Sequence, residues 1–194
     1  MFLLTRPDGP TIDKFLATGR GQAFSYPEVG ATRETAPVGY NIDHNRILLG
    51  TGQAAFARAK TAVSSWQMFA LGWVELCYPQ TRIAADETVA VMVNHFGFYS
   101  LNAARIVYTI DEAERFGFAY GTLVEHGEIG EERFPVEYLS ETHEVWYDLF
   151  AFSRPGSLLA KLGYPLSRHL QKRFAHDSKM AMVRSVSDAD AVIE

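Results

Sequence analysis

The chain has 194 residues, a length typical of one globular domain. Apolar residues make up 47% of it and charged residues 21%, which excludes a disordered chain and a protein with several membrane spans. The net charge of −5 argues against binding to nucleic-acid backbones, and a single cysteine, Cys77, excludes an intramolecular disulfide framework.

The first residues lack the pattern of a secretory signal. The apolar run is three residues long, Phe2 to Leu4, and Pro7 follows closely. No window approaches the 18 apolar residues of a membrane span. We therefore expect a cytoplasmic protein with no membrane span and no nucleic-acid partner.

Residues 1–40 predict a loop-rich arm. Residues 11–17 are compatible with a short helix that places Ile12, Phe15 and Leu16 on one face, and glycines and prolines interrupt the chain after it. We assign an N-terminal arm to residues 1–25, a single domain to 26–185 and a frayed tail to 186–194.

The next segment predicts strand, helix and strand. Residues 40–49 have the composition of a strand, and Gly50-Thr51-Gly52 turns the chain. Phe56, Ala59, Val63 and Trp66 then follow at spacings of three and four, which is one stripe of an amphipathic helix. Residues 73–78 predict a second strand that Pro79 ends.

Residues 87–153 alternate apolar and polar positions almost throughout, as half-buried strands do. The pattern predicts a loop at 125–131 and strands over 88–96, 104–110, 116–122, 132–138 and 143–152. It aligns Ala104, Ile106, Tyr108 and Ile110 on one face. Both faces of the last strand carry aromatic residues, so the N-terminal arm or a second subunit should cover its outer face.

A long helix should follow from residue 158, with a kink at Pro165. Leu166, Leu170 and Phe174 continue its apolar stripe at i, i+4 spacing, to about Met182. Elements segregated in this order favour an α+β fold in which a curved antiparallel sheet is covered on one face by the C-terminal helix.

Several polar side chains lie at positions that the alternation of apolar and polar residues assigns to the core. Buried hydroxyl groups need hydrogen-bond partners, and a buried unpaired carboxylate is costly. Either these residues reach solvent at strand ends, or they surround a cavity that holds a ligand. The candidates for ligand binding are His95, Tyr108, Tyr120, Glu132, Tyr138 and Tyr147.

Other motifs weigh against cofactor and metal chemistry. The run Gly50 to Ala55 is similar to a dinucleotide-binding loop, but residues 87–153 contain no crossover helix, so we expect no cofactor. The six histidines lack metal-ligand spacing, and we expect no metal. Residues 126–134 combine His126 with carboxylates, an arginine and glycines; they form either an acid–base pair or a solvated hairpin rim.

The sequence resembles the family known as domain of unknown function 1990, from about Tyr26 to Met182. The resemblance rests on the order of several short strings, among them Leu49-Gly50-Thr51-Gly52, Phe56-Ala57-Arg58-Ala59, Gly117-Phe118-Ala119-Tyr120-Gly121 and Ser153-Arg154-Pro155. It implies a START-like, helix-grip fold with a cavity between sheet and helix. It supplies no catalytic residues.

Three functions are compatible with these features. The first is binding of a small apolar or amphipathic ligand in the cavity. The second is a small cyclase, hydratase or hydrolase that uses Glu132 or His126 as general base. The third is an interaction protein that forms a homodimer through its aromatic outer face.

Overall fold

The fold is taken from a computed structural model of the chain, which describes residues 1–124, 126, 128–156 and 164–187. Nine strands form one sheet, in which β2, β9, β7, β6, β5, β4 and β3 are successive neighbours. Strand β1 pairs with β5, and β8 pairs with both β6 and β9. Each pairing is antiparallel, so the α+β fold with a curved antiparallel sheet is confirmed.

The strands are β1 (Phe2–Leu3), β2 (Asn41–Thr51), β3 (Val74–Leu76), β4 (Thr88–His95), β5 (Phe98–Asp111), β6 (Arg115–Thr122), β7 (Glu128–Arg133), β8 (Val136–Leu139) and β9 (Glu144–Pro155). The helices are α1 (Gly9–Arg20), α2 (Gly52–Ser64) and α4 (Tyr164–Ser187), with short 3-10 turns η1 (Ala31–Arg33) and η2 (Gln67–Phe69).

The helix predicted around Phe56 is confirmed as α2. It begins directly after β2, with Thr51 in extended conformation at its N-cap, and its inward face buries Phe56, Ala59 and Val63. Trp66 follows the helix with a positive φ of 56° and is buried, and its indole N–H donates to the Thr81 carbonyl at 2.8 Å. Gly50-Thr51-Gly52 is therefore a strand-to-helix turn in an antiparallel sheet.

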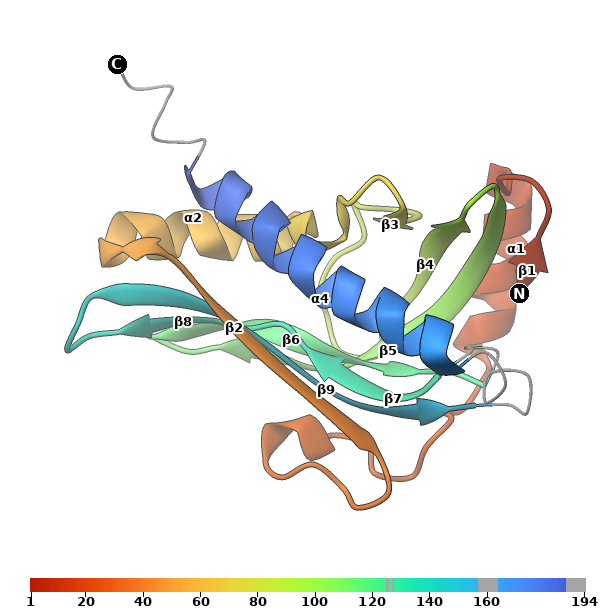
Figure 1. The fold of residues 1–194 in the computed structure, drawn as a ribbon, viewed down its shortest axis with the longest axis horizontal. Coiled ribbons are helices and arrows are strands. Elements are labelled where there is room, and N and C mark those ends of the chain that lie inside the picture. Colours follow the sequence, from red (N-terminus) through yellow and green to blue (C-terminus); the bar gives the residue numbers. More distant parts are fainter. Residues whose placement is uncertain (125, 127, 157–163, 188–194) are drawn as a thin grey trace.

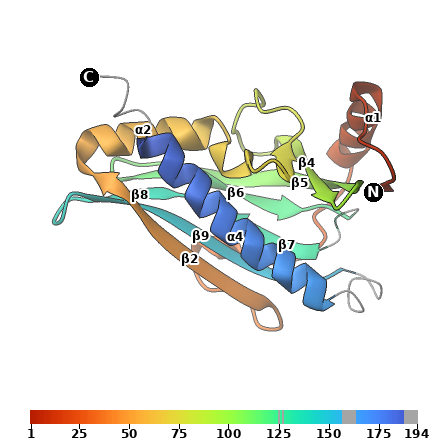
Figure 2. The same ribbon diagram turned by 45° about the horizontal axis from the view of Figure 1, so that its top comes forward.

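Helix α4 crosses the concave face of the sheet diagonally, and α2 lies beside its C-terminal half (Figures 1 and 2). Ala175, Met182 and Val186 of α4 belong to the same buried cluster as α2 and η2. Of the predicted stripe, Phe174 packs against this cluster and Met182 belongs to it, whereas Leu166 is 56% exposed. Pro165 lies in the first described turn of α4, and the helix predicted before it lies largely at 157–163, outside the described residues.

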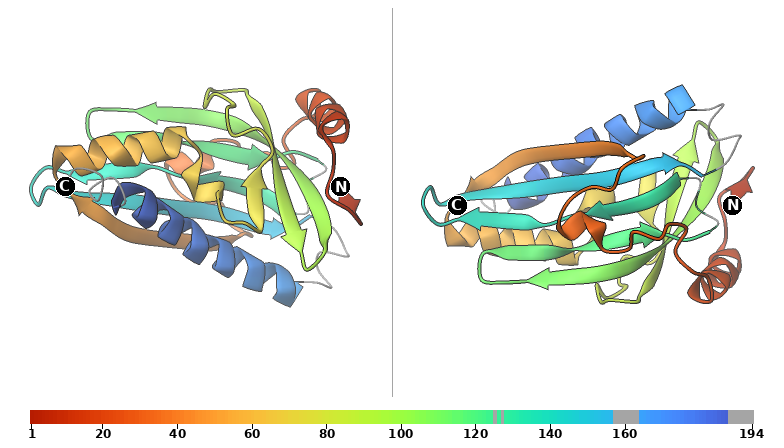
Figure 3. Two further views of the ribbon diagram at one scale, coloured as in Figure 1. Left: turned by 90° about the horizontal axis from the view of Figure 1, so that it is seen from above. Right: turned by 90° about the horizontal axis from the view of Figure 1, so that it is seen from below.

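The segment between α1 and β2, residues 21–40, covers the convex face of the sheet, opposite α4 (Figure 3), and is called the arm from here on. Most of it lies in the range 26–185 that the sequence analysis assigned to the domain. Tyr26 and Tyr40 both pack edge-on against Phe152 of β9, with ring centroids 5.6 and 5.0 Å apart. Glu131 of β7, only 2% exposed, accepts hydrogen bonds from the Tyr26 hydroxyl at 2.7 Å and from the amide and hydroxyl groups of Thr32. The arm thus covers the outer face of β9 at Phe152.

The sequence pattern was wrong about the strand predicted over 132–138. A strand already begins at Glu128, inside the predicted loop, and a separate strand begins at Val136. Pro135 lies between them and lacks the N–H group that a continuous ladder requires. Gly117 of β6 accommodates this interruption, because a side chain there would meet the Phe134 and Pro135 backbone at 2.5–2.6 Å.

The sequence pattern also placed Tyr108 on the wrong face. The pairing of β5 with β6 shifts register between Ile106 and Tyr108, so that Ile106 pairs with Tyr120 but Tyr108 pairs with Ala119. Such a bulge adds one residue to one strand and reverses the alternation beyond it. Tyr108 and Ile110 therefore lie with Ala119 in a separate cluster, away from Ile106.

None of the described helices is long and apolar enough to cross a membrane.

Replacing Tyr26 by phenylalanine tests the attachment of the arm. The variant removes one donor from the buried Glu131 carboxylate, so we expect a loss of about 1–3 kcal/mol in the free energy of unfolding. Urea denaturation measures it. Tyr78→Phe is the matched control, because the Tyr78 hydroxyl bonds Asp13 in an exposed position and its loss should change stability by about 0.5 kcal/mol or less. Equal effects would contradict the proposed role of Glu131.

Candidate functional site

A cavity of about 790 Å³ lies between the concave face of the sheet and the N-terminal half of α4. Its walls are mostly apolar, and the strands contribute Val91, Val93 and Leu149. Leu166, Leu170 and Phe174 of α4 line the opposite side. The apolar stripe of α4 therefore faces a cavity over part of its length.

Glu132 and Tyr120 form the polar centre of the concave wall. The two residues are paired across β6 and β7, and the Tyr120 hydroxyl donates to Glu132 Oε2 at 3.1 Å. Burial is the main reason that the pKa of Glu132 is raised to about 8, and the nearby Asp43 carboxylate also raises it. The hydrogen bond from Tyr120 acts in the opposite direction and lowers this pKa. Glu132 is thus largely protonated at pH 7, in a position where a ligand can reach it.

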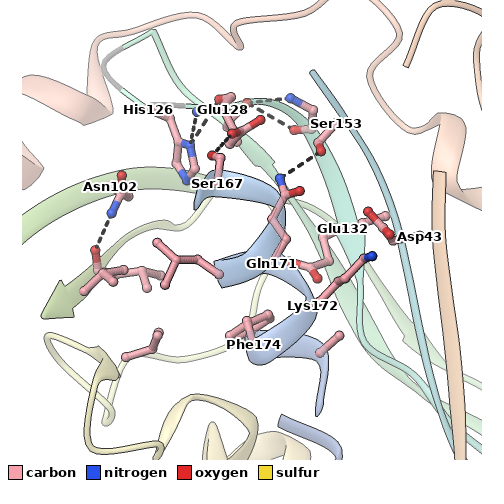
Figure 4. A pocket seen from close by; sticks show the side chains of 18 of the residues that line it. Asp43, Asn102, His126, Glu128, Glu132, Ser153, Ser167, Gln171, Lys172 and Phe174 are labelled. Carbon is pink, nitrogen blue, oxygen red and sulfur yellow. Dashed lines mark hydrogen bonds between the residues drawn. The ribbon is translucent and has the colours of Figure 1, made fainter. Parts of the chain in front are cut away.

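His126, Glu128 and Ser167 form a second polar group in the cavity (Figure 4). The Ser167 hydroxyl of α4 donates to Glu128 Oε1 at 2.5 Å, and His126 Nδ1 lies 3.1 Å from both backbone polar atoms of Glu128. Burial lowers the pKa of His126 to about 4, so the ring is neutral at pH 7. Burial also raises the pKa of Glu128. The segment predicted as either an acid–base pair or a solvated rim lies against the cavity.

His95 lies at the end of β4, near exposed aromatic residues. Its Nε2 atom is 2.9 Å from the Ser100 hydroxyl, and its ring stacks on Phe98 with centroids 5.2 Å apart. The ring centroid of Phe2 in β1 lies 6.2 Å from that of His95. All four side chains line the cavity, and burial lowers the pKa of His95.

The structure brings together three of the six candidate side chains, His95, Tyr120 and Glu132, around the cavity. It places the other three elsewhere. Tyr108 lies on the convex side, where its hydroxyl is 2.8 Å from that of Thr32. Tyr138 packs under α2 and bonds His143 at 2.6 Å.

Tyr147 does face α4, but it does not line this cavity. It is fully buried, and its hydroxyl lies 3.1 Å from that of Ser178 in α4. Burial raises its pKa. The sequence pattern correctly predicted that Tyr147 lies on the inner face of β9. Its surroundings are a packed core, because α2, η2 and α4 cover this part of the sheet.

Several cavity residues escaped sequence reasoning. Asn102 bonds the Ser100 hydroxyl at 3.1 Å, and the Gln171 amide of α4 donates to Ser153 Oγ at 3.1 Å. Ser167 and Gln171 are four residues apart, beside the apolar stripe of α4, and this spacing was the one signal for them. Among the described residues, no three His, Cys, Asp or Glu side chains are arranged to hold a metal ion.

A curved antiparallel sheet that holds a long C-terminal helix, with a cavity between them, defines a helix-grip protein. Two solved structures share this fold: a hypothetical protein from Helicobacter pylori (13% identity, TM-score 0.52, 83% of this chain and 94% of that one) and a protein from Thermus thermophilus (12% identity, TM-score 0.50, 77% and 99%).

The sequence profile of the family described as Domain of unknown function (DUF1990) matches residues 25–181, and the chain belongs to this family. It is similar over nearly its whole length to two curated relatives, each named UPF0548 protein. The one from Dictyostelium discoideum is 33% identical and the alignment covers 96% of each chain. The one from Deinococcus radiodurans is 37% identical, covering 95% of this chain and 98% of the relative. The predicted family is confirmed.

Glu132→Gln tests the titration of the buried carboxyl. The pKa of Glu132 lies near 8 in the folded chain and at 4.5 ordinarily, so the folded state binds more protons between these values. The free energy of unfolding therefore decreases as pH rises from about 4.5 through 8. Glutamine does not ionise, and we expect the variant to match wild type at pH 5 and to exceed it by about 1–4 kcal/mol at pH 9. Urea titrations at both pH values measure this; a difference independent of pH would refute it.

Proposed function

We propose that this protein binds a small apolar or amphipathic molecule in the cavity between the sheet and α4. The observation that carries the proposal is the cavity itself, whose volume of about 790 Å³ lies within the range of about 300–1,000 Å³ of small-molecule sites. Its walls are mostly apolar, with a few polar side chains at defined places, as in such sites. Residues 26–185 would form the binding unit.

The polar end of the ligand would meet Glu132 and Tyr120. Tyr120 is 8% exposed and Glu132 is half-buried, so both are largely removed from bulk water while still lining the cavity. A buried carboxyl without a charged partner is unfavourable unless a ligand or water supplies hydrogen bonds. His95 and His126 would contact the ligand at other points of the wall.

Filling the cavity should abolish binding. Ala151 lies on β9 opposite Glu132 and lines the cavity, so Ala151→Trp would occupy the ligand's volume. We expect native mass spectrometry of wild-type protein, purified gently or exposed to lipid and metabolite extracts, to show an added mass that this variant lacks. Thr109→Trp is the matched control, on an exposed position of β5 outside the cavity. A bare polypeptide mass in every extract, or equal retention by both variants, would refute the proposal.

One observation favours enzymatic activity as a second candidate function. The cavity holds a carboxyl, Glu132, and a neutral imidazole, His126, whose pKa values are displaced toward opposite sides of pH 7. Groups whose environments displace their pKa values in this way are suited to proton transfer. His126 could accept a proton as general base and protonated Glu132 could donate one, as in a cyclase, hydratase or hydrolase.

Activity would appear as chemical conversion of a bound compound. We expect mass spectrometry of an incubated extract to show the same compound depleted by wild type and spared by both His126→Asn and Glu132→Gln. Recovery of every bound compound with unchanged mass would leave binding as the function. Homodimer formation stays a prediction that light scattering tests, although Phe152, one of the aromatic residues that suggested it, is covered by the arm.

A further inference from the structure

The cavity contains more carboxyl groups than cations to neutralise them. Asp43, Glu128 and Glu132 all line it. Asp43 forms an ion pair with Arg168 of α4, with N–O distances of 2.5 and 2.7 Å. In the part of the chain that the structure describes, Glu128 and Glu132 form no ion pair, although the Arg168 guanidinium partly offsets the effect of burial on the pKa of Glu128. An anionic ligand beside Glu132 would gain no ion pair with it and would further oppose its ionisation.

Glu132 has an oxygen available to a ligand. Its Oε2 atom accepts from the Tyr120 hydroxyl, and its second oxygen has no hydrogen-bond partner among the described residues. Lys172 of α4 also lines the cavity, but its side chain is exposed and its ammonium group forms no ion pair with a described residue. It lies on the same side of the cavity as Glu132 and Asp43 (Figure 4), so it competes with a cationic ligand without neutralising Glu132.

Aromatic rings continue the wall from Tyr120. The centroid of Phe69 is 6.0 Å from that of Tyr120 and 5.5 Å from that of Phe174, and all three residues line the cavity. Aromatic faces attract cations as well as apolar groups. The Trp73 ring, also in the wall, already has the Arg173 guanidinium 4.3 Å from its centroid.

We propose that the ligand of this cavity carries a protonated amine, which binds at Glu132 beside the Tyr120 ring, and an apolar body that lies along Phe69 and Phe174. This inference rests on the proposed binding function and adds the chemical class of the ligand. The ammonium group would supply the cation that Glu132 lacks, and the available carboxyl oxygen would accept its hydrogen bond.

Protonation of Glu132 links this binding to pH. The charged and titratable groups that face it are Asp43 from β2, Tyr120 from β6, Tyr147 from β9 and, along α4, Arg168 and Lys172. Because its pKa is about 8 in the free protein, Glu132 must lose its proton when an ammonium group binds at pH 7. Amine affinity should therefore rise severalfold for each pH unit between 6 and 8.

Three probes with one skeleton test the ligand class: 4-phenylbutylamine, 4-phenylbutanol and 4-phenylbutanoate. We expect calorimetry at pH 7 to give at least tenfold tighter binding for the amine than for the other two. Titrations in two buffers of different ionisation enthalpy should show nearly one proton released per amine bound. Glu132→Gln should abolish both the preference and the proton release while keeping alcohol binding, whereas Glu128→Gln, the matched carboxyl control, should keep the proton release.

Lys172→Gln gives an independent readout. Removing the competing cation should strengthen amine binding. The proposal would be overturned if 4-phenylbutanoate bound most tightly of the three probes and Lys172→Gln abolished that binding. Equal affinities for the three probes would also overturn it. Binding of none of them would also overturn it, and the extract experiment with Ala151→Trp then decides separately whether the cavity binds any molecule.

Discussion

The rest of the structure depends on one constraint: a single helix cannot fill the concave face of so large and curved a sheet. The C-terminal half of α4, together with α2 and η2, closes one end into a packed core around Trp66, Phe69 and Tyr147. The N-terminal half has no such companion helix among the described residues, and its apolar stripe faces a cavity (Figure 2). Because close packing leaves few voids in protein interiors, a space of this size in an otherwise well-packed fold supports the proposed binding function.

The two faces of β7 connect the arm to the cavity. Consecutive residues of a strand point to opposite faces, so Glu131 lies on the convex side and Glu132 on the concave side. The arm holds Glu131 through Tyr26, Gly30 and Thr32, with no cation bonded to it among the described residues. These hydrogen bonds fix the position of β7, and through it the position of the carboxyl that faces the cavity. The arm therefore contributes to the site although most of it lies on the opposite side of the sheet.

Burial shifts the pKa values of Glu132 and His126, which both line the cavity, in opposite directions. It raises the pKa of Glu132 to about 8 and lowers that of His126 to about 4, because a low-dielectric site disfavours the charged form of each. Both groups are thus mainly neutral at pH 7, which suits an apolar cavity without a ligand. A cationic ligand changes this balance at Glu132, and a neutral one does not. In the proposed function, the protonation of Glu132 would therefore connect the affinity of the cavity to the charge of its ligand.

The sequence by itself determined the order of most elements and the α+β class, because apolar periodicity reports which face of each strand or helix is buried. The order of its short strings identified the family. The sequence also determined that Tyr120 and Glu132 face inward. Only the tertiary structure decided where their shared face is packed and where it is open, since that depends on how far α2 and η2 extend over the sheet. It alone revealed the bulge that turns Tyr108 outward, because one additional residue in a strand leaves no mark in composition. It also brought Glu128, Ser167 and Gln171 together from distant segments, which no local pattern could specify.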